Sequence, residues 1–304
     1  MRALSMAAVV LALIVVVMGA YVRLSDAGLG CPDWPLCYGQ PVPADIADRD
    51  ALAKAWKEMG HRYLAGTLGA LILAIAVAAW RLRQSAPLAG VLVLLVAFQA
   101  TLGKWTVTML LKPAIVTAHL LGGMATLALL AWLALARWPH VPAPEMRALR
   151  RVAAIALAAL VVQIALGGWV SANYAALACP DLPLCRGTVD FARAFHVVRE
   201  LGQTSEGDLL SHDALRAIHW THRLFALVAL AVVLLAALRA WRLSRGLAIT
   251  VAALVALQFA LGVLNVALGL PLALAAAHNA GAALLLLALV VLNFFAFRGL
   301  RPSQ

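Results

Sequence analysis

Charged residues are scarce in this sequence: they make up 12% of its 304 residues, whereas apolar residues make up 64%. The mean hydropathy is correspondingly high, at +0.94. In ordinary soluble domains only about half of the residues are apolar. The composition therefore excludes an ordinary soluble domain and indicates a protein that lies in a lipid bilayer.

Uninterrupted apolar runs account for this composition. Runs of about 18 or more apolar residues are typical of membrane-spanning helices, because backbone polar groups in lipid must be satisfied within the segment. The first run lacks a convincing signal-peptide cleavage site, so we count it as a structural helix. The sequence thus predicts an all-α integral membrane protein with eight spans, at residues 4–22, 62–80, 88–109, 114–136, 150–170, 218–238, 246–268 and 272–297.

Acidic residues are nearly absent from one set of loops. With the N-terminus in the cytoplasm, the inner loops and tails hold 12 of the 24 basic residues but only Glu145 of the 13 acids. This asymmetry follows the positive-inside rule, so the net charge of +11 needs no nucleic-acid partner. We expect a multi-pass protein of the bacterial cytoplasmic membrane, with both termini inside and the long loops 23–60 and 171–217 on the outer face.

The sequence contains an internal duplication. Residues 19–37 align without a gap with residues 167–185 at an offset of 148, and residues 99–119 align with residues 258–278 at an offset of 159. Each half has an even number of helices, so both copies enter the membrane in the same orientation as a parallel repeat. The predicted organisation is two tandem parallel four-helix bundles: an N-terminal half at 1–138, a cytoplasmic linker at 139–149 and a C-terminal half at 150–304.

Four histidines occupy matched positions in the two copies: His61 with His222, and His119 with His278. The topology places all four in the outer part of the membrane, where an ionisable side chain is costly and indicates function by default. Each is followed four residues later, on the same helix face, by glycine or alanine. This pattern favours paired haem sites with imidazole axial ligands. Interhelical hydrogen bonds and close helix packing are the alternatives.

Other polar residues accompany the histidines. Arg62 and Arg223 follow the first histidine of each pair and either anchor their helices at the interface or bind haem propionates. Glu58 lies three residues before His61, on the same helix face. It is either a carboxylate favoured by the dipole of a helix N-terminus or a general acid/base. The second copy has His219 at this position, so the two halves can have different functions.

The four cysteines form two pairs, each with five intervening residues. Neither pair has the short C-x2-C spacing of common zinc sites. Both are expected on the outer face, where disulfides persist. The sequence therefore favours two short disulfide-closed loops, Cys31–Cys37 and Cys179–Cys185, with a redox-active dithiol as the main alternative.

Taken together, these motifs resemble the haem A synthase family over nearly the whole chain. The resemblance implies that His222 and His278 ligate a haem b cofactor and that Arg62 and Arg223 bind haem groups. It implies that His61 and His119 bind haem O as the substrate, and that Glu58 assists the oxidation of a methyl group to formyl through an alcohol stage. Implied partners are haem O synthase, assembly factors of cytochrome oxidase and an electron donor that the sequence does not identify.

Two rival functions use some of the same residues. A bis-histidine electron-transfer cytochrome needs the same haem ligands but does not modify haem. A membrane thiol oxidoreductase explains the cysteine pairs but not four histidines inside the membrane. The haems bound to the purified protein distinguish the three functions.

Overall fold

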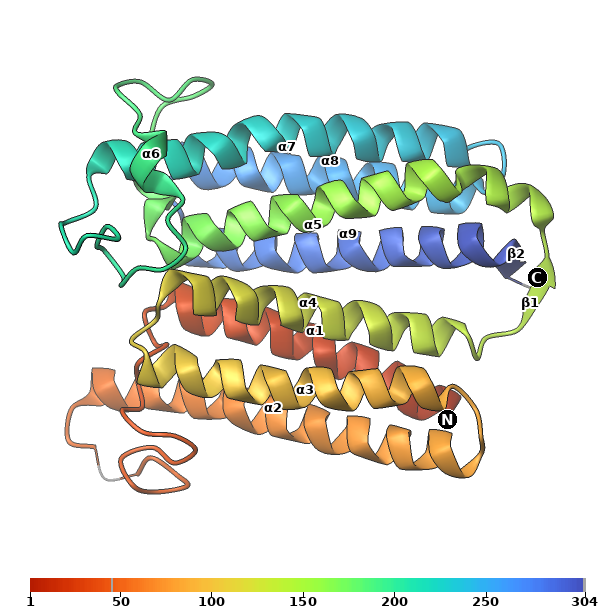
Figure 1. The fold of residues 1–304 in the computed structure, drawn as a ribbon, viewed down its shortest axis with the longest axis horizontal. Coiled ribbons are helices and arrows are strands. Elements are labelled where there is room, and N and C mark those ends of the chain that lie inside the picture. Colours follow the sequence, from red (N-terminus) through yellow and green to blue (C-terminus); the bar gives the residue numbers. More distant parts are fainter. Residues whose placement is uncertain (45, 303–304) are drawn as a thin grey trace.

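The computed structural model describes residues 1–44 and 46–302, and within these ranges it is built from eight long helices (Figure 1). All eight are long and apolar enough to cross a membrane, so the predicted spans are confirmed. Their bounds are α1 (Arg2–Leu24), α2 (Arg49–Arg81), α3 (Ala86–Thr108), α4 (Pro113–Leu135), α5 (Arg150–Ala172), α7 (His212–Ala240), α8 (Arg245–Ala267) and α9 (Leu272–Arg298).

Two of these helices begin well before the apolar runs. The expectation that His61 and His222 lie at the starts of their helices is wrong, because α2 begins at Arg49 and α7 at His212. Side-chain caps explain both starts: the carboxylate of Asp48 accepts from the N–H of Asp50, and the hydroxyl of Ser211 accepts from the N–H of Ala214. The extra turns are polar, so a search for apolar runs does not detect them.

The remaining elements are short. They are the 3-10 helices η1 (Pro144–Leu149) and η2 (Ala175–Leu177), the helix α6 (Phe191–Ala194) and the strands β1 (His140–Pro142) and β2 (Leu300–Pro302). The two strands pair antiparallel, with His140 opposite Pro302. This pairing is an addition to the all-α prediction, and it joins the linker between the halves to the C-terminal end of α9.

The helices contact one another in two groups of four. In the first group, α1 and α3 each contact both α2 and α4. In the second group, α5 and α8 each contact both α7 and α9. The groups meet where α9 packs on α1 and α4, and where α4 packs on α5. Figure 1 shows both chain termini at one end of the helices and the long loops at the other.

The interface between the groups joins equivalent positions of the two copies. A guanidinium N–H of Arg23 donates to the carbonyl of Ser171 over 2.8 Å, and the hydroxyl of Tyr174 lies 3.3 Å from the carboxylate of Asp26. Both pairs are 148 residues apart, which is the offset of the repeat. The same surface of each copy therefore faces its counterpart.

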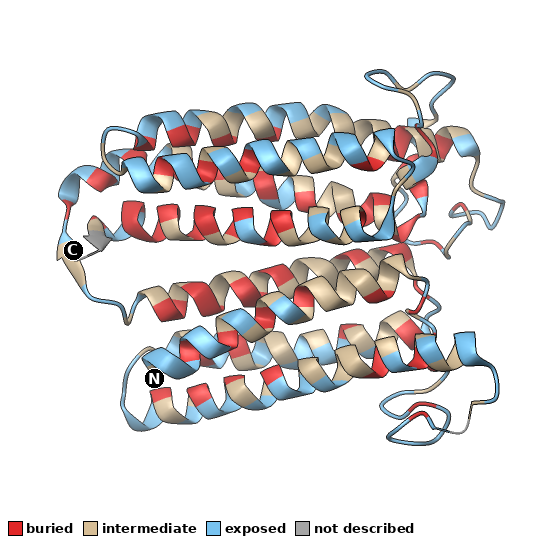
Figure 2. Cartoon of the chain, turned by 180° about the vertical axis from the view of Figure 1, so that it is seen from behind, coloured by how far each residue is buried: buried red, intermediate tan, exposed pale blue. Residues whose placement is uncertain are grey.

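Burial is concentrated at this interface. In α9, 72% of the residues in an 18-residue apolar stretch are buried (Figure 2). The corresponding share in the other long helices is 17% to 33%. The outward faces carry exposed apolar side chains such as Leu94 and Leu238, which are 72% and 71% exposed. Such faces suit contact with lipid, which is as apolar as leucine.

Candidate functional site

Each of the four matched histidines packs edge-on against a glycine of a neighbouring helix. A methyl group added at that glycine would come within contact distance or closer of the imidazole Cε1 atom. A larger residue would crowd the imidazole most at Gly19 and Gly167, and would make an ordinary contact at Gly103. The pairs, with the distance from Cε1 to the added carbon, are His61–Gly19 at 2.9 Å, His222–Gly167 at 3.0 Å, His278–Gly262 at 3.2 Å and His119–Gly103 at 3.4 Å.

The four histidines form one pair in each half. His61 and His119 lie on α2 and α4 of the first group of helices, and His222 and His278 lie on α7 and α9 of the second group. No group of three or more His, Cys, Asp or Glu side chains suited to a metal ion occurs in residues 1–44 and 46–302. A bis-histidine haem needs only two imidazoles from the protein, because the macrocycle supplies the other four ligands of the iron.

The imidazoles also have unused hydrogen-bonding capacity. The Nδ1 atoms of His61, His119 and His278 are buried and have no hydrogen-bond partner within the described part of the chain. Buried polar atoms are normally hydrogen-bonded, so such atoms need an explanation. The rings themselves are only half-buried. Imidazoles that keep some accessible surface and lack hydrogen-bond partners fit the binding of haem iron.

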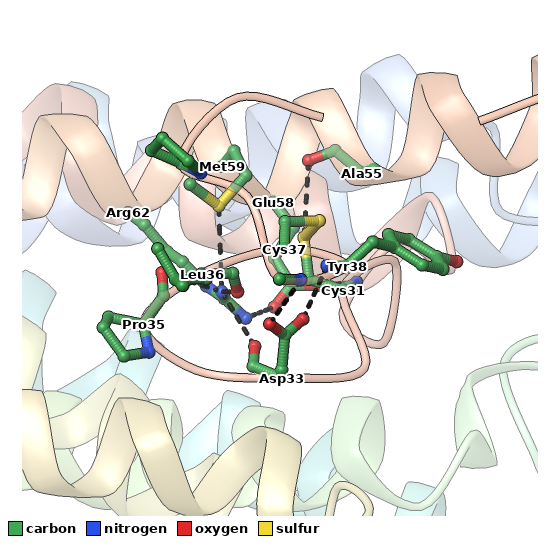
Figure 3. The surroundings of a disulfide bond; sticks show 12 residues. Cys31, Asp33, Pro35, Leu36, Cys37, Tyr38, Ala55, Glu58, Met59 and Arg62 are labelled. Atoms are coloured by element: carbon green, nitrogen blue, oxygen red, sulfur yellow. Dashed lines mark hydrogen bonds and ion pairs between the residues drawn. A yellow bond between two sulfur atoms is a disulfide. The ribbon is translucent and has the colours of Figure 1, made fainter. Parts of the chain in front are cut away.

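Beside the first pair, Glu58 and Arg62 hold the first disulfide loop onto α2 (Figure 3). One carboxylate oxygen of Glu58, which is 5% exposed, accepts from the N–H of Cys31 over 2.9 Å, and the other forms an ion pair with Arg62. Arg62 donates in turn to the carbonyls of Asp33 and Leu36, over 3.0 and 2.7 Å. Glu58 lies three turns inside α2, so the alternative of a carboxylate at a helix N-terminus is wrong.

Arg223 holds the second disulfide loop in the same way. Its guanidinium donates to the carbonyl of Asp181 over 2.7 Å and to the carbonyl of Cys179. Its Nε atom lies 3.3 Å from Nε2 of His219, which is 5% exposed. His219 thus replaces Glu58 as the partner of the arginine one turn further on. Neither sequence-based alternative for Arg62 and Arg223 included a contact with these loops.

The structure contains both disulfides that the cysteine spacing favoured, Cys31–Cys37 and Cys179–Cys185. Cys31 and Cys37 are completely buried. The first loop also contacts α2 more closely than a side chain would permit, because a methyl group at Gly30 would lie 2.6 Å from the backbone carbonyl carbon of Lys54. The second copy has Ala178 at the position of Gly30. The first loop is therefore the more closely packed of the two.

Known proteins are similar in sequence to nearly the whole chain. The sequence family COX15-CtaA, described as cytochrome oxidase assembly protein, matches residues 2–290. The chain is 43% identical to a heme A synthase of Shewanella oneidensis, over 94% of this chain and 93% of that protein. It is 33% identical to a heme A synthase of Caulobacter vibrioides, over 97% and 94% of the two chains. The chain therefore belongs to the COX15-CtaA family of cytochrome oxidase assembly proteins.

Proposed function

We propose that this protein is a haem A synthase, a membrane oxidoreductase that oxidises a methyl group of haem O to formyl and so forms haem A for cytochrome oxidase. The observation that carries the proposal is the set of four histidines, each fitted against a glycine, that recurs in both halves. The full-length similarity to heme A synthases supports the same reaction.

The two pairs of histidines are assigned different haems. In the C-terminal half, 150–304, His222 and His278 are the proposed axial ligands of haem b, which supplies one-electron redox chemistry when it is bound. In the N-terminal half, 1–138, His61 and His119 bind haem O as the substrate. The presence of Glu58 in this half alone supports the assignment, since its carboxylate lies on the same helix face as His61.

We propose that Glu58 and Arg62 have two roles in the substrate site. They position the first disulfide loop over the site through their bonds to Cys31 and to the loop carbonyls. The carboxylate of Glu58 is also the proposed group that holds or transfers a proton near His61. A guanidinium has five N–H donors, so Arg62 and Arg223 retain donors for haem propionates beyond those that bind the loops.

The electron-transfer cytochrome is the second candidate, because the same histidines serve it. The two functions can be distinguished by expressing this chain in a cell that makes haem O but no haem A. Extraction and chromatography of the haems should show haem A only in cells that carry the chain. Haem O alone in those cells, with haem b bound to the purified protein, would favour the cytochrome. A thiol oxidoreductase is disfavoured by the complete burial of Cys31 and Cys37.

We place the protein in the bacterial cytoplasmic membrane with both termini in the cytoplasm and both disulfide loops outside. The gathering of the termini at one end of the helices supports their lying on the same side of the membrane (Figure 1). The basic loops at that end assign that side to the cytoplasm. A reporter fused at Gln203 should behave as exported and one fused at Ala143 as cytoplasmic. The reverse pattern would contradict the orientation. In this arrangement haem O synthase supplies the substrate, and assembly factors of cytochrome oxidase accept the product.

A further inference from the structure

Two neighbouring pockets lie around the turn between α2 and α3, at the end of the helices that holds both chain termini (Figure 1). The first has a volume of about 460 Å³ and is lined by Arg2, Gln84, Ser85, Ala136 and Arg137. The second has a volume of about 490 Å³ and is lined by Trp80, Arg81, Arg83, Ser85, Ala86 and Pro87. Because Ser85 lines both, the two pockets adjoin.

Two guanidinium groups are held at the first pocket with donors to spare. Arg137 donates to the side-chain oxygen and to the backbone carbonyl of Gln84, over 2.8 and 3.0 Å. The guanidinium carbon of Arg2 lies 3.7 Å from the centroid of the Trp138 ring, which is a cation–π contact. A guanidinium has five N–H donors. Both arginines are therefore fixed in place and still able to bind an anion.

The arginines at these pockets have no counter-ion in the protein. None of the ion pairs within residues 1–44 and 46–302 includes an arginine that lines either pocket. Glu145 is the only acid expected at this end of the helices. The positive-inside rule accounts for basic residues here, but it does not require that several of them surround a pocket. An anion from outside the chain has to balance their charge.

The second copy of the repeat does not form this arrangement. At the offset of 148, Arg2 corresponds to Arg150, and these residues begin α1 and α5. Arg150 donates to the carbonyl of Phe297 over 2.9 Å at the end of α9. At the offset of 159, Arg137 corresponds to Ala296. The pair of held arginines is thus a property of the first copy and not a requirement of the repeated fold.

The surroundings of the pockets suit the phosphate group of a lipid. Arginine forks match phosphate oxygens, and α3 begins at Ala86 without a side-chain cap, so its first N–H groups also face an anion favourably. Trp80 lines the second pocket and continues a row of exposed apolar side chains, Leu73 and Val77, on one face of α2. An acyl chain has an apolar surface along this row, which a soluble phosphate compound would not use.

We infer that the two pockets bind the phosphate headgroup of an anionic phospholipid, from the leaflet at the end of the helices that holds the termini, through Arg2 and Arg137. Basic pockets beside membrane helices bind such headgroups by charge and hydrogen bonding. A lipid with net negative charge is preferred over a zwitterionic one, because no acid at the pockets pairs with a headgroup cation. The inference does not rest on the proposed function, since it concerns the end of the helices opposite the disulfide loops.

The test is a lipid titration of the full-length protein, stripped of lipid in a non-ionic detergent and followed by native mass spectrometry. The added lipids are dioleoylphosphatidylglycerol, which is anionic, and dioleoylphosphatidylcholine, which has the same phosphate but no net charge. The wild type should bind the anionic lipid more tightly. Arg2→Gln and Arg137→Gln should each weaken that binding about fivefold, the effect of one arginine near an anionic lipid surface. Equal affinity for the two lipids would overturn the inference.

The matched control is Arg242→Gln, which removes the same charge at the same end of the helices. Arg242 is exposed and lines neither pocket, so this variant should bind the anionic lipid as the wild type does. Equal weakening in all three variants would show general attraction and overturn the site. Displacement of the lipid by excess inorganic phosphate would also overturn it, in favour of a soluble phosphate compound. If Arg137→Gln does not accumulate, Arg2→Gln decides alone.

Discussion

Replacing His222 or His278 by alanine is expected to abolish the low-spin haem b spectrum of the purified protein. Each substitution removes one of two axial imidazoles and leaves the iron with an open coordination position. The remaining imidazole lies on another helix and can fill only one of the two axial positions. The measurement is the visible spectrum of the oxidised and reduced protein, with haem content determined after extraction.

The matched control for this prediction is His119→Ala, which makes the same change at the same repeat position in the other half. It should retain the haem b spectrum at wild-type intensity while haem A formation is lost, since His119 belongs to the proposed substrate pair. A low-spin haem b that survives in the His222 or His278 variant, or disappears in the His119 variant, would reverse the assignment of the two halves.

Replacing Glu58 by glutamine is expected to lower conversion of haem O by roughly 10²- to 10⁴-fold, the range in which general acid–base groups contribute. The amide oxygen can still accept from the N–H of Cys31, although the ion pair with Arg62 is lost. Arg62 also donates to the carbonyls of Asp33 and Leu36, so the first disulfide loop should stay in place. What the amide cannot do is exchange a proton. The readout is the ratio of haem O to haem A in extracts, together with the haem b spectrum, which should be unchanged.

Asp50→Asn is the control for the Glu58 variant. Asp50 is an exposed acid on the same helix and pairs with Lys54, so its loss should leave both readouts at wild-type values. Normal haem A formation by the Glu58→Gln protein would remove Glu58 from the chemistry. Loss of haem b from that protein would show instead that the carboxylate supports the whole structure.

Much of the fold could be predicted from the sequence because every helix that spans a lipid bilayer needs a long apolar run. Eight apolar runs of sufficient length are detected directly, whereas the first turns of α2 and α7 are polar and are specified by the caps at Asp48 and Ser211. The β1–β2 pairing joins the linker to residues about 160 positions later, just after α9. No local pattern in three-residue strands that contain proline predicts such a partner.

The candidate site was predictable only where its residues carry a chemical signature. Histidines inside a membrane and cysteines at a repeated spacing have such a signature. The contacts of Arg62 and Arg223 do not, because their acceptors are backbone carbonyls, which every residue has. Gly19 and Gly167 are visible in the repeat, but only the structure shows that an imidazole lies against each of them.

The bonds from Arg23 to Ser171 and from Tyr174 to Asp26 resemble the contacts at the two-fold axis of a homodimer. In a two-fold symmetric dimer, a surface patch meets the same patch of the partner, and here each bond joins one repeat position to its own equivalent. The chain is in this sense a dimer whose two subunits have been joined end to end. Because both halves lie in one chain, a residue in one half can differ from the residue at the equivalent position in the other half. The subunits of a homodimer cannot differ in this way. Glu58 opposite His219 is an asymmetry of this kind, which a dimer of identical subunits could not have.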